Sequence, residues 1–123
     1  MSNELTGEII GAAIEVHRQV GPGLLEAIYE ECLISELKQR GLRLLNQYPL
    51  PIFYKGRQLN SAYRLDLLVE DKVIVELKTV ESLTGLHKAQ LLTYLKLAKL
   101  RYGLLLNFNV SMMRQGIVRM LND

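Results

Sequence analysis

Apolar residues recur at steps of three and four through the first third of the chain, and this spacing predicts two amphipathic helices. The apolar face of the first helix is formed by Leu5, Ile9, Ala13, Val16 and Val20. This helix is expected to end at residues 20–23, because Pro22 disfavours helical geometry at the residue before it. A second helix is expected from about Leu24 to Arg40, followed by a capping glycine, with a stripe of Leu25, Ile28, Tyr29, Cys32, Leu33 and Leu37.

Beyond the second helix the hydrophobic period changes to two, which indicates β-strands. Residues 48–54 alternate and contain Pro49 and Pro51, which predicts an edge strand because proline lacks the N–H that a central strand donates. The remaining expected elements are a turn at 55–57, strands at 63–69 and 73–78, a helix capped by Ser82 or Thr84 and running to about Leu97, and strands at 102–106 and 116–121. The order α-α-β-β-β-α-β-β predicts one mixed α/β domain over residues 1–123.

The two strands at 63–69 and 73–78 read as a hairpin in which one face is apolar throughout. Residues on that face are Leu65, Leu67, Val69, Val73, Val75 and Leu77, and residues on the other are Asp66, Leu68, Ile74, Glu76 and Lys78. Matching the faces requires Asp66 opposite Glu76, with a three-residue loop at 70–72. The pattern therefore places two carboxylates side by side, and Lys78 follows two residues later on the same face.

Side-by-side carboxylates repel each other, at about 1 kcal/mol or less when exposed and more when buried. A divalent cation offsets this repulsion, and Mg²⁺ is commonly bound by one or two carboxylates together with waters and substrate phosphate. Lys78 could neutralise part of the charge or contact a phosphate or an attacking water. The alternative explanation is a surface ladder of ion pairs formed by Asp66, Glu76 and Lys78.

Composition adds limits to this picture. The net charge of +2 neither requires nor excludes a polyanionic partner, although sequence-independent nucleic-acid binders are usually more basic. Cys32 is the single cysteine of the sequence, so no intrachain disulfide is possible and a reducing cytoplasmic location is expected. No apolar stretch is long enough to span a membrane and the N-terminus lacks a signal-peptide pattern, so no membrane partner is expected.

Three spaced motifs resemble those of a known group of enzymes. Asp66 followed by Glu76-Leu77-Lys78 is similar to the D…ExK signature of the PD-(D/E)XK nuclease superfamily. Gln90 and Tyr94, on the expected helix after the hairpin, resemble the QxxxY motif of its RecB-like branch. Upstream, residues 23–29 spell Gly-x-x-Glu-x-x-Tyr, which matches the small GxxExxY protein family assigned to the same superfamily. The resemblance covers essentially the whole chain and implies a restriction-endonuclease-like mixed β-sheet core flanked by helices.

The resemblance also implies roles for individual residues. Asp66, Glu76 and Glu26 would hold Mg²⁺ or Mn²⁺, and Lys78 would act with them as a catalytic residue. For Glu26, the alternative is a carboxylate that interacts with the helix dipole near the start of the second helix. Gln90, Tyr94 and His87 would contact substrate; they share one helix face, and the alternative for the first two is a half-buried polar pair that packs this helix.

The leading hypothesis is a metal-dependent phosphodiesterase that acts on DNA or RNA. The second is a non-catalytic binding or assembly module that keeps the nuclease fold, which the modest charge favours because few phosphate contacts are available. A homodimer or an accessory protein partner is compatible with either. A small-molecule phosphate enzyme is disfavoured, because residues 21–23 have neither the length nor the lysine of a phosphate-binding loop.

Overall fold

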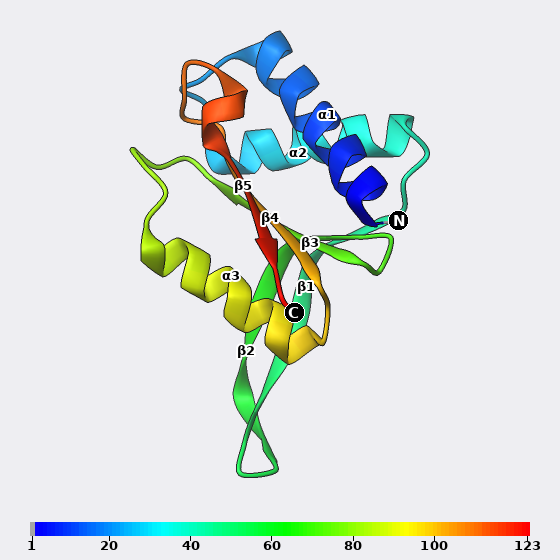
Figure 1. Ribbon diagram of the computed structural model, residues 1–123, viewed down its shortest axis with the longest axis vertical. Coiled ribbons are helices and arrows are strands. Elements are labelled where there is room, and N and C mark those ends of the chain that lie inside the picture. The colour runs from blue at the N-terminus through cyan, green and yellow to red at the C-terminus, as the bar shows by residue number, and fades with distance from the viewer. Residues whose placement is uncertain (1) are drawn as a thin grey trace.

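The computed structural model describes residues 2–123, and its elements follow the predicted order with one addition (Figure 1). The helices are α1 (Ser2–Val20), α2 (Glu26–Gln39) and α3 (Gly85–Ala98), and a short 3-10 helix, η1 (Met113–Gly116), precedes the last strand. The strands are β1 (Leu44–Tyr54), β2 (Arg57–Val69), β3 (Val73–Lys78), β4 (Tyr102–Asn107) and β5 (Ile117–Leu121). They form one sheet in the order β1-β2-β3-β4-β5, so the proline-containing strand lies at an edge, as predicted.

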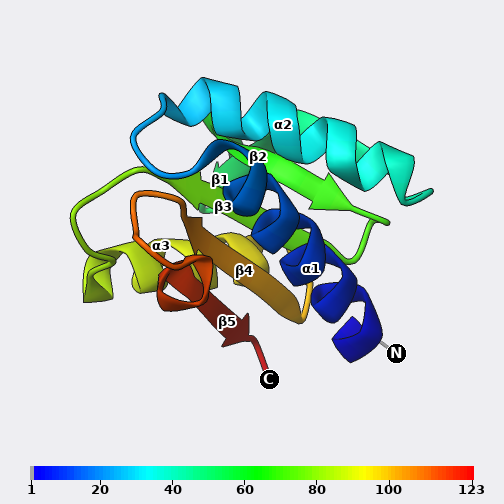
Figure 2. The same ribbon diagram turned by 90° about the horizontal axis from the view of Figure 1, so that it is seen from above.

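Helices cover the two faces of this sheet, with α1 and α2 on one side and α3 on the other (Figure 2). β3 and β4 pair in parallel, and α3 is the crossover helix that parallel pairing requires. The larger cluster of buried apolar side chains lies beneath α1 and α2, and the smaller one lies beneath α3. β3 is therefore buried on both faces, which explains its nearly continuous apolar sequence.

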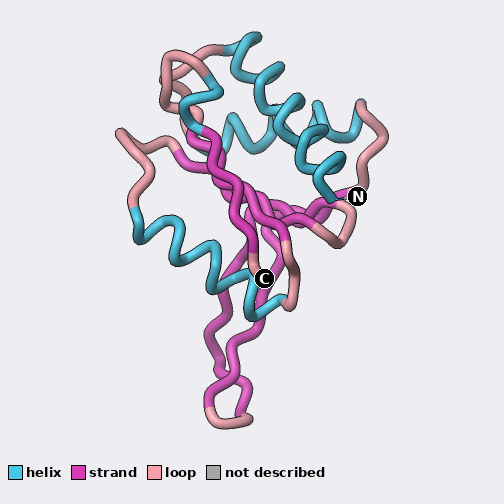
Figure 3. Tube along the Cα trace, viewed as in Figure 1, coloured by secondary structure: helices cyan, strands magenta, loops and turns pink. Residues whose placement is uncertain are grey.

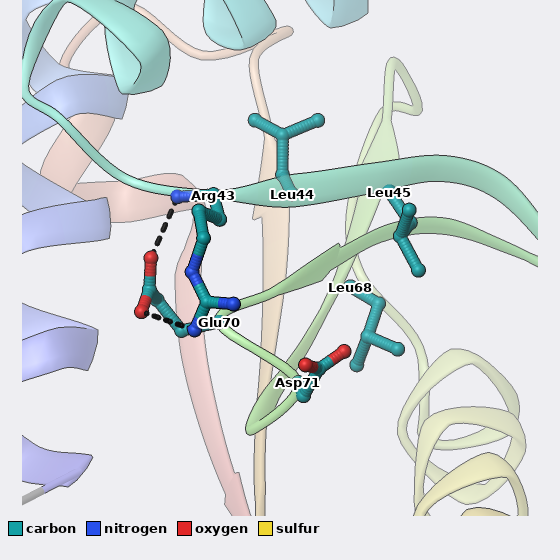
Figure 4. Close-up of a pocket in the computed structure, with 6 residues that line it drawn as sticks. All are labelled: Arg43, Leu44, Leu45, Leu68, Glu70 and Asp71. Carbon is teal, nitrogen blue, oxygen red and sulfur yellow. Dashed lines mark hydrogen bonds and ion pairs between the residues drawn. The ribbon is translucent and has the colours of Figure 1, made fainter.

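The predicted register of the β2–β3 hairpin is confirmed. Leu67 pairs with Val75, Leu68 with Ile74, and Val69 with Val73, so the next residues in line are Asp66 and Glu76. The hairpin loop is fastened to the start of β1: the Glu70 carboxylate accepts hydrogen bonds from the Arg43 backbone N–H at 2.6 Å and from its guanidinium at 3.2 Å (Figure 4). This contact holds three strands together at the end of the sheet that lies opposite the carboxylate pair.

Two predictions about apolar faces are corrected. Leu65 was assigned to the face of Leu67 and Val69, but it packs in the cluster beneath α3. The ladder between β2 and β3 ends at Leu67, and the next N–H, that of Asp66, is donated to the Glu76 side chain. The alternation of β2 breaks at this point, where the facing residue of β1, Gln47, has a positive φ. In α2 the buried residues are Tyr29, Leu33 and Leu37, and Cys32 is partly buried against the same cluster. Ile28 is instead 42% exposed, and Leu25, the residue before the helix, is 73% exposed.

Element boundaries also differ from those predicted. The β1–β2 hairpin is longer at both strands and turns on two residues, Lys55 and Gly56, both with positive φ. Gly116 ends η1 instead of beginning the last strand, and a Cβ at this position would overlap the Asn107 carbonyl oxygen. Within residues 2–123, no helix combines the length and the apolar character that crossing a membrane requires.

Candidate active site

Asp66 and Glu76 are linked by reciprocal hydrogen bonds between β2 and β3. The Glu76 carboxylate accepts the Asp66 backbone N–H at 2.8 Å, and the Asp66 carboxylate accepts the Leu77 N–H at 2.8 Å. Each carboxylate therefore has one oxygen fixed by the opposite strand. Within the described structure the Oε1 of Glu76 accepts no hydrogen bond, and the Oδ1 of Asp66 accepts one at 3.4 Å from the Gln47 amide.

Burial and mutual repulsion perturb both carboxyl groups. Glu76 is 5% exposed, and burial, followed by the charge of Asp66, raises its pKa to about 8. The pKa of Asp66 is also raised, mainly by burial, and the Leu77 hydrogen bond opposes this. Among the described residues, no basic side chain lies within ion-pair distance of either carboxylate. The expected alternative of an ion-pair ladder is therefore not the arrangement in this structure.

Glu26 and Lys78 belong to the same electrostatic neighbourhood. Glu26 is the first residue of α2, and its pKa is raised by partial burial and then by the charge of Asp66. Lys78 lies at the end of β3. Its positive charge opposes the rise in the pKa of Glu26, Asp66 and Glu76 but does not cancel it. In the part of the chain that the structure describes, no three His, Cys, Asp or Glu side chains converge closely enough to hold a metal ion together.

The glycine and tyrosine of the Gly23–Tyr29 motif fix the position of Glu26. Gly21 and Gly23 both have positive φ, which permits the sharp turn between α1 and α2. Tyr29 is fully buried and stacks on Phe108; its hydroxyl donates to the Gly21 carbonyl and accepts the Leu24 N–H. The motif is thus a structural device that anchors the turn and begins α2 at Glu26.

The predicted residues of α3 line a hollow next to Lys78. Gln90, Tyr94 and His87 line it together with Lys78 and Tyr63. Tyr94 is 5% exposed and its ring contacts that of Tyr63, with centroids 4.9 Å apart. Burial, and then the charge of Glu76, raises the pKa of Tyr94 to about 12, so its hydroxyl remains protonated at neutral pH.

His87 has a local structural contact besides its place in this hollow. Its Nδ1 accepts the Thr84 N–H at 3.1 Å, and the Thr84 hydroxyl accepts the His87 N–H at 3.3 Å, which forms a reciprocal cap at the start of α3. Because Nδ1 accepts this bond, the neutral ring carries its proton on Nε2. Substrate contact by His87 stays a prediction, limited to that second nitrogen.

Sequence reasoning missed Gln47, which contacts Asp66, and Glu30, which contacts Gln47. The Gln47 amide donates to the Glu30 carboxylate at 3.0 and 3.2 Å and to Asp66 at 3.4 Å, and so joins α2 to β2. Glu30 follows Glu26 by four residues, and this helical spacing could have identified it as a neighbour on the same face. Gln47 gave no such signal, because it lies in a β1 segment that was not expected to be a strand and has a positive φ.

Asn107, also missed, is buried at the end of β4 beside Lys78. Its side chain accepts the Val80 N–H at 3.1 Å and donates to the Val80 carbonyl at 2.9 Å. These bonds hold the segment that follows Lys78 against the neighbouring strand. Asn107 therefore supports the position of Lys78 from β4, whereas Asp66 lies on β2, the other neighbour of β3.

A family model described as the PD-(D/E)XK nuclease superfamily matches residues 3–120. No curated protein matches the chain. The matched region includes the five-stranded mixed sheet, its helices and the paired carboxylates, and this architecture is consistent with a restriction-endonuclease-like fold. Since the match extends over almost the whole chain, the protein belongs to the PD-(D/E)XK nuclease superfamily.

Proposed function

We propose that this protein is a metal-dependent phosphodiesterase that cleaves DNA or RNA at the Asp66–Glu76 pair. The observation that carries the proposal is the arrangement of the two carboxylates, each held at one oxygen by the opposite strand. The remaining oxygens, Glu76 Oε1 and Asp66 Oδ1, lack a strong partner in the described structure. The family match supports the same class of activity.

This donor set fits a hard divalent cation. Two carboxylates, each with one oxygen that lacks a strong partner, are the protein share of a Mg²⁺ or Mn²⁺ site that is completed by waters and substrate phosphate. Glu26, at the start of α2, would add a third carboxylate through a bridging water, because it does not converge with Asp66 and Glu76 closely enough to bind the same ion directly. When bound, the ion would supply Lewis acidity toward a water and toward the scissile phosphate.

The other side chains have separate tasks. Lys78 would orient the attacking water and stabilise the negative charge that develops on the phosphate. The protonated hydroxyl of Tyr94 and the exposed amide of Gln90 can donate hydrogen bonds to phosphate oxygens in the hollow beside Lys78. These assignments of catalytic and substrate-binding roles belong to the proposal.

The test is cleavage of end-labelled single- and double-stranded DNA and RNA with Mg²⁺ or Mn²⁺. Asp66→Asn keeps an oxygen that can accept the Leu77 N–H but removes the charge, so we expect loss of cleavage without loss of the fold. Asp71→Asn is the matched control, because Asp71 is exposed in the hairpin loop and Asn tolerates its positive φ. If the wild-type protein binds no divalent ion at millimolar concentration, the non-catalytic assembly module replaces this proposal.

A further inference from the structure

The β1–β2 hairpin continues beyond the body of the sheet as a two-stranded arm, defined here as residues 48–64. β2 pairs with β3 through Val69, Leu68 and Leu67, whereas its pairing with β1 extends to Arg57 opposite Tyr54. Figures 1 and 3 show the arm projecting past α3, away from α1 and α2. Every residue from 57 to 64 is exposed, so the arm has almost no core of its own.

Exposed aromatic rings are concentrated on this arm. Phe53 and Tyr54, at the tip, are 60% and 63% exposed, and Tyr48 and Tyr63 lie closer to the sheet at 40% and 37%. The sequence holds eight Phe and Tyr residues in all, so half of them are exposed on one projecting hairpin. Several large apolar side chains exposed on one projecting segment indicate an interaction site, whereas single exposed apolar residues are common on any protein surface.

The charge of the arm has one sign. Residues 48–64 contain Lys55, Arg57 and Arg64 and no aspartate or glutamate, although the whole chain has nearly equal numbers of acids and bases. At the tip, the Lys55 ammonium lies 5.5 Å from the centre of the Tyr54 ring, so cation and ring form one surface. Positive charge interleaved with exposed rings is the chemistry that recognises a single-stranded nucleic acid, whose phosphates and unpaired base faces are both accessible.

The arm is continuous with the candidate active site. Tyr63 at its base contacts the ring of Tyr94, and both line the hollow that contains Lys78 and Gln90. A strand bound along the arm would therefore lead over this hollow toward Asp66 and Glu76. Edge-to-edge pairing of two arms is disfavoured at β1, because Pro49 and Pro51 remove N–H donors, and at the edges of both β1 and β2, because the arm has only positive charge and two copies would repel each other.

We propose that the arm at residues 48–64 binds single-stranded nucleic acid, with its aromatic rings stacking on bases and Lys55 and Arg57 contacting phosphates. The inference rests on the proposed function for the nature of the substrate and adds how that substrate is gripped. Tyr54 and Phe53 stack on bases at the tip, and the strand continues past Tyr63 to the hollow beside Lys78.

Binding is measured by fluorescence anisotropy with the intact protein in EDTA, which prevents metal-dependent cleavage. The probes are labelled single-stranded and duplex DNA and RNA of equal length. We expect single strands of at least one sugar type to bind more tightly than the duplexes. Lys55→Asn with Arg57→Gln should weaken this binding roughly tenfold and lower the slope of log K against log salt by about 1.4, the value for two lost phosphate contacts. Tyr54→Ala should weaken it roughly 5- to 100-fold with the slope unchanged.

The matched controls are Lys38→Gln with Arg114→Gln, which remove the same charge at exposed positions outside the arm, and Met112→Ala, an exposed apolar residue of another loop. Control variants that weaken binding as much as the arm variants would overturn the proposal, as would equal or tighter binding of duplexes. A change in oligomeric state on Tyr54→Ala, measured by sedimentation, would overturn it in favour of a self-interface. If the arm variants weaken binding but the protein cleaves no substrate, the binding role of the arm is supported and the nuclease proposal is rejected. If the protein cleaves and the arm variants bind as the wild type does, the nuclease proposal is supported and the binding role of the arm is rejected.

Discussion

The Asp66 and Glu76 carboxylates each accept a backbone N–H from the other's strand, at 2.8 Å in both cases. The exchange takes the place of a ladder bond at the point where β2 and β3 part, and it fixes the separation of two groups that repel each other. The backbone donors offset part of that repulsion, but the pKa of both carboxyl groups is still raised. The pair is therefore destabilising when both groups are ionised and no cation is bound.

The first prediction is that the metal-free protein loses stability as the pH rises from about 5 to 8. The pKa of Glu76 is about 8 in the folded state, against 4.5 as the ordinary value, so in this window the folded state binds more protons than the unfolded state. The free energy of unfolding then decreases with pH, and Glu76 contributes a decrease on the order of 3 kcal/mol. Denaturant unfolding in EDTA at a series of pH values measures it.

Glu76→Gln is the control for this prediction. The amide oxygen can still accept the Asp66 N–H, but the side chain no longer ionises. We expect a flatter pH profile and greater stability than the wild type at pH 8. Equal slopes for the two proteins would show that Glu76 is not the group responsible.

The second prediction concerns the turn before Glu26. Tyr29→Phe removes the hydroxyl that joins the Gly21 carbonyl to the Leu24 N–H, and this should lower the free energy of unfolding by about 1–3 kcal/mol. Tyr48→Phe, at a half-exposed position on β1, should change it by about 0.5 kcal/mol or less. Chemical denaturation compares the two, and similar losses would contradict the anchoring role of Tyr29.

The third prediction uses two glycines with opposite surroundings. Gly116→Ala would place a methyl group against the Asn107 carbonyl oxygen and should destabilise the protein by roughly 1–3 kcal/mol or more. Gly7→Ala lies in the exposed face of α1 with no atom near the new methyl group, and it should stabilise the protein by about 0.5–1 kcal/mol. Thermal or denaturant unfolding measures both, and a neutral Gly116→Ala would show that β4 and η1 separate easily.

The hairpin register was predictable from the sequence because burial constrains both faces of β3. Apolar residues are required on both faces of β3, and a register shift of one residue would make Glu76 face the larger cluster beneath α1 and α2. Only the alignment of Asp66 with Glu76 therefore satisfies both faces. The same reasoning failed at Leu65, because the regular alternation of β2 breaks at Asp66, where pairing with β3 has ended and the facing residue of β1, Gln47, has a positive φ.

The arm and the Gln47 contact could not be predicted in the same way. Residues 57–62 are mostly polar and all exposed, so no hydrophobic period marks them as a strand. They are extended because the tight turn at Lys55–Gly56 pairs them with β1. Gln47 reaches Glu30 and Asp66 through contacts between segments far apart in the sequence. Such contacts depend on tertiary packing, and local pattern carries no information about them.

The last prediction separates the role of Lys78 from that of the carboxylates. Lys78→Ala should lower the rate of phosphodiester cleavage by about 10²–10³-fold, the usual loss on removing one group that stabilises transition-state charge. Its Mn²⁺ affinity should stay the same or rise, because removing a neighbouring cation cannot weaken the attraction of Asp66 and Glu76 for the ion. Asp66→Asn should instead lose both cleavage and Mn²⁺ binding.

Calorimetric Mn²⁺ titration beside a cleavage assay makes the comparison, with Lys72→Ala as the control because Lys72 is an exposed lysine of the hairpin loop. If Lys78 only balanced charge in the fold, Lys78→Ala would alter unfolding and leave the cleavage rate of the folded protein unchanged. If it were needed to hold the ion, Mn²⁺ affinity would fall together with cleavage. Loss of cleavage with intact Mn²⁺ binding is therefore the result that assigns Lys78 to the chemical step, since neither a structural nor a metal-holding role produces it.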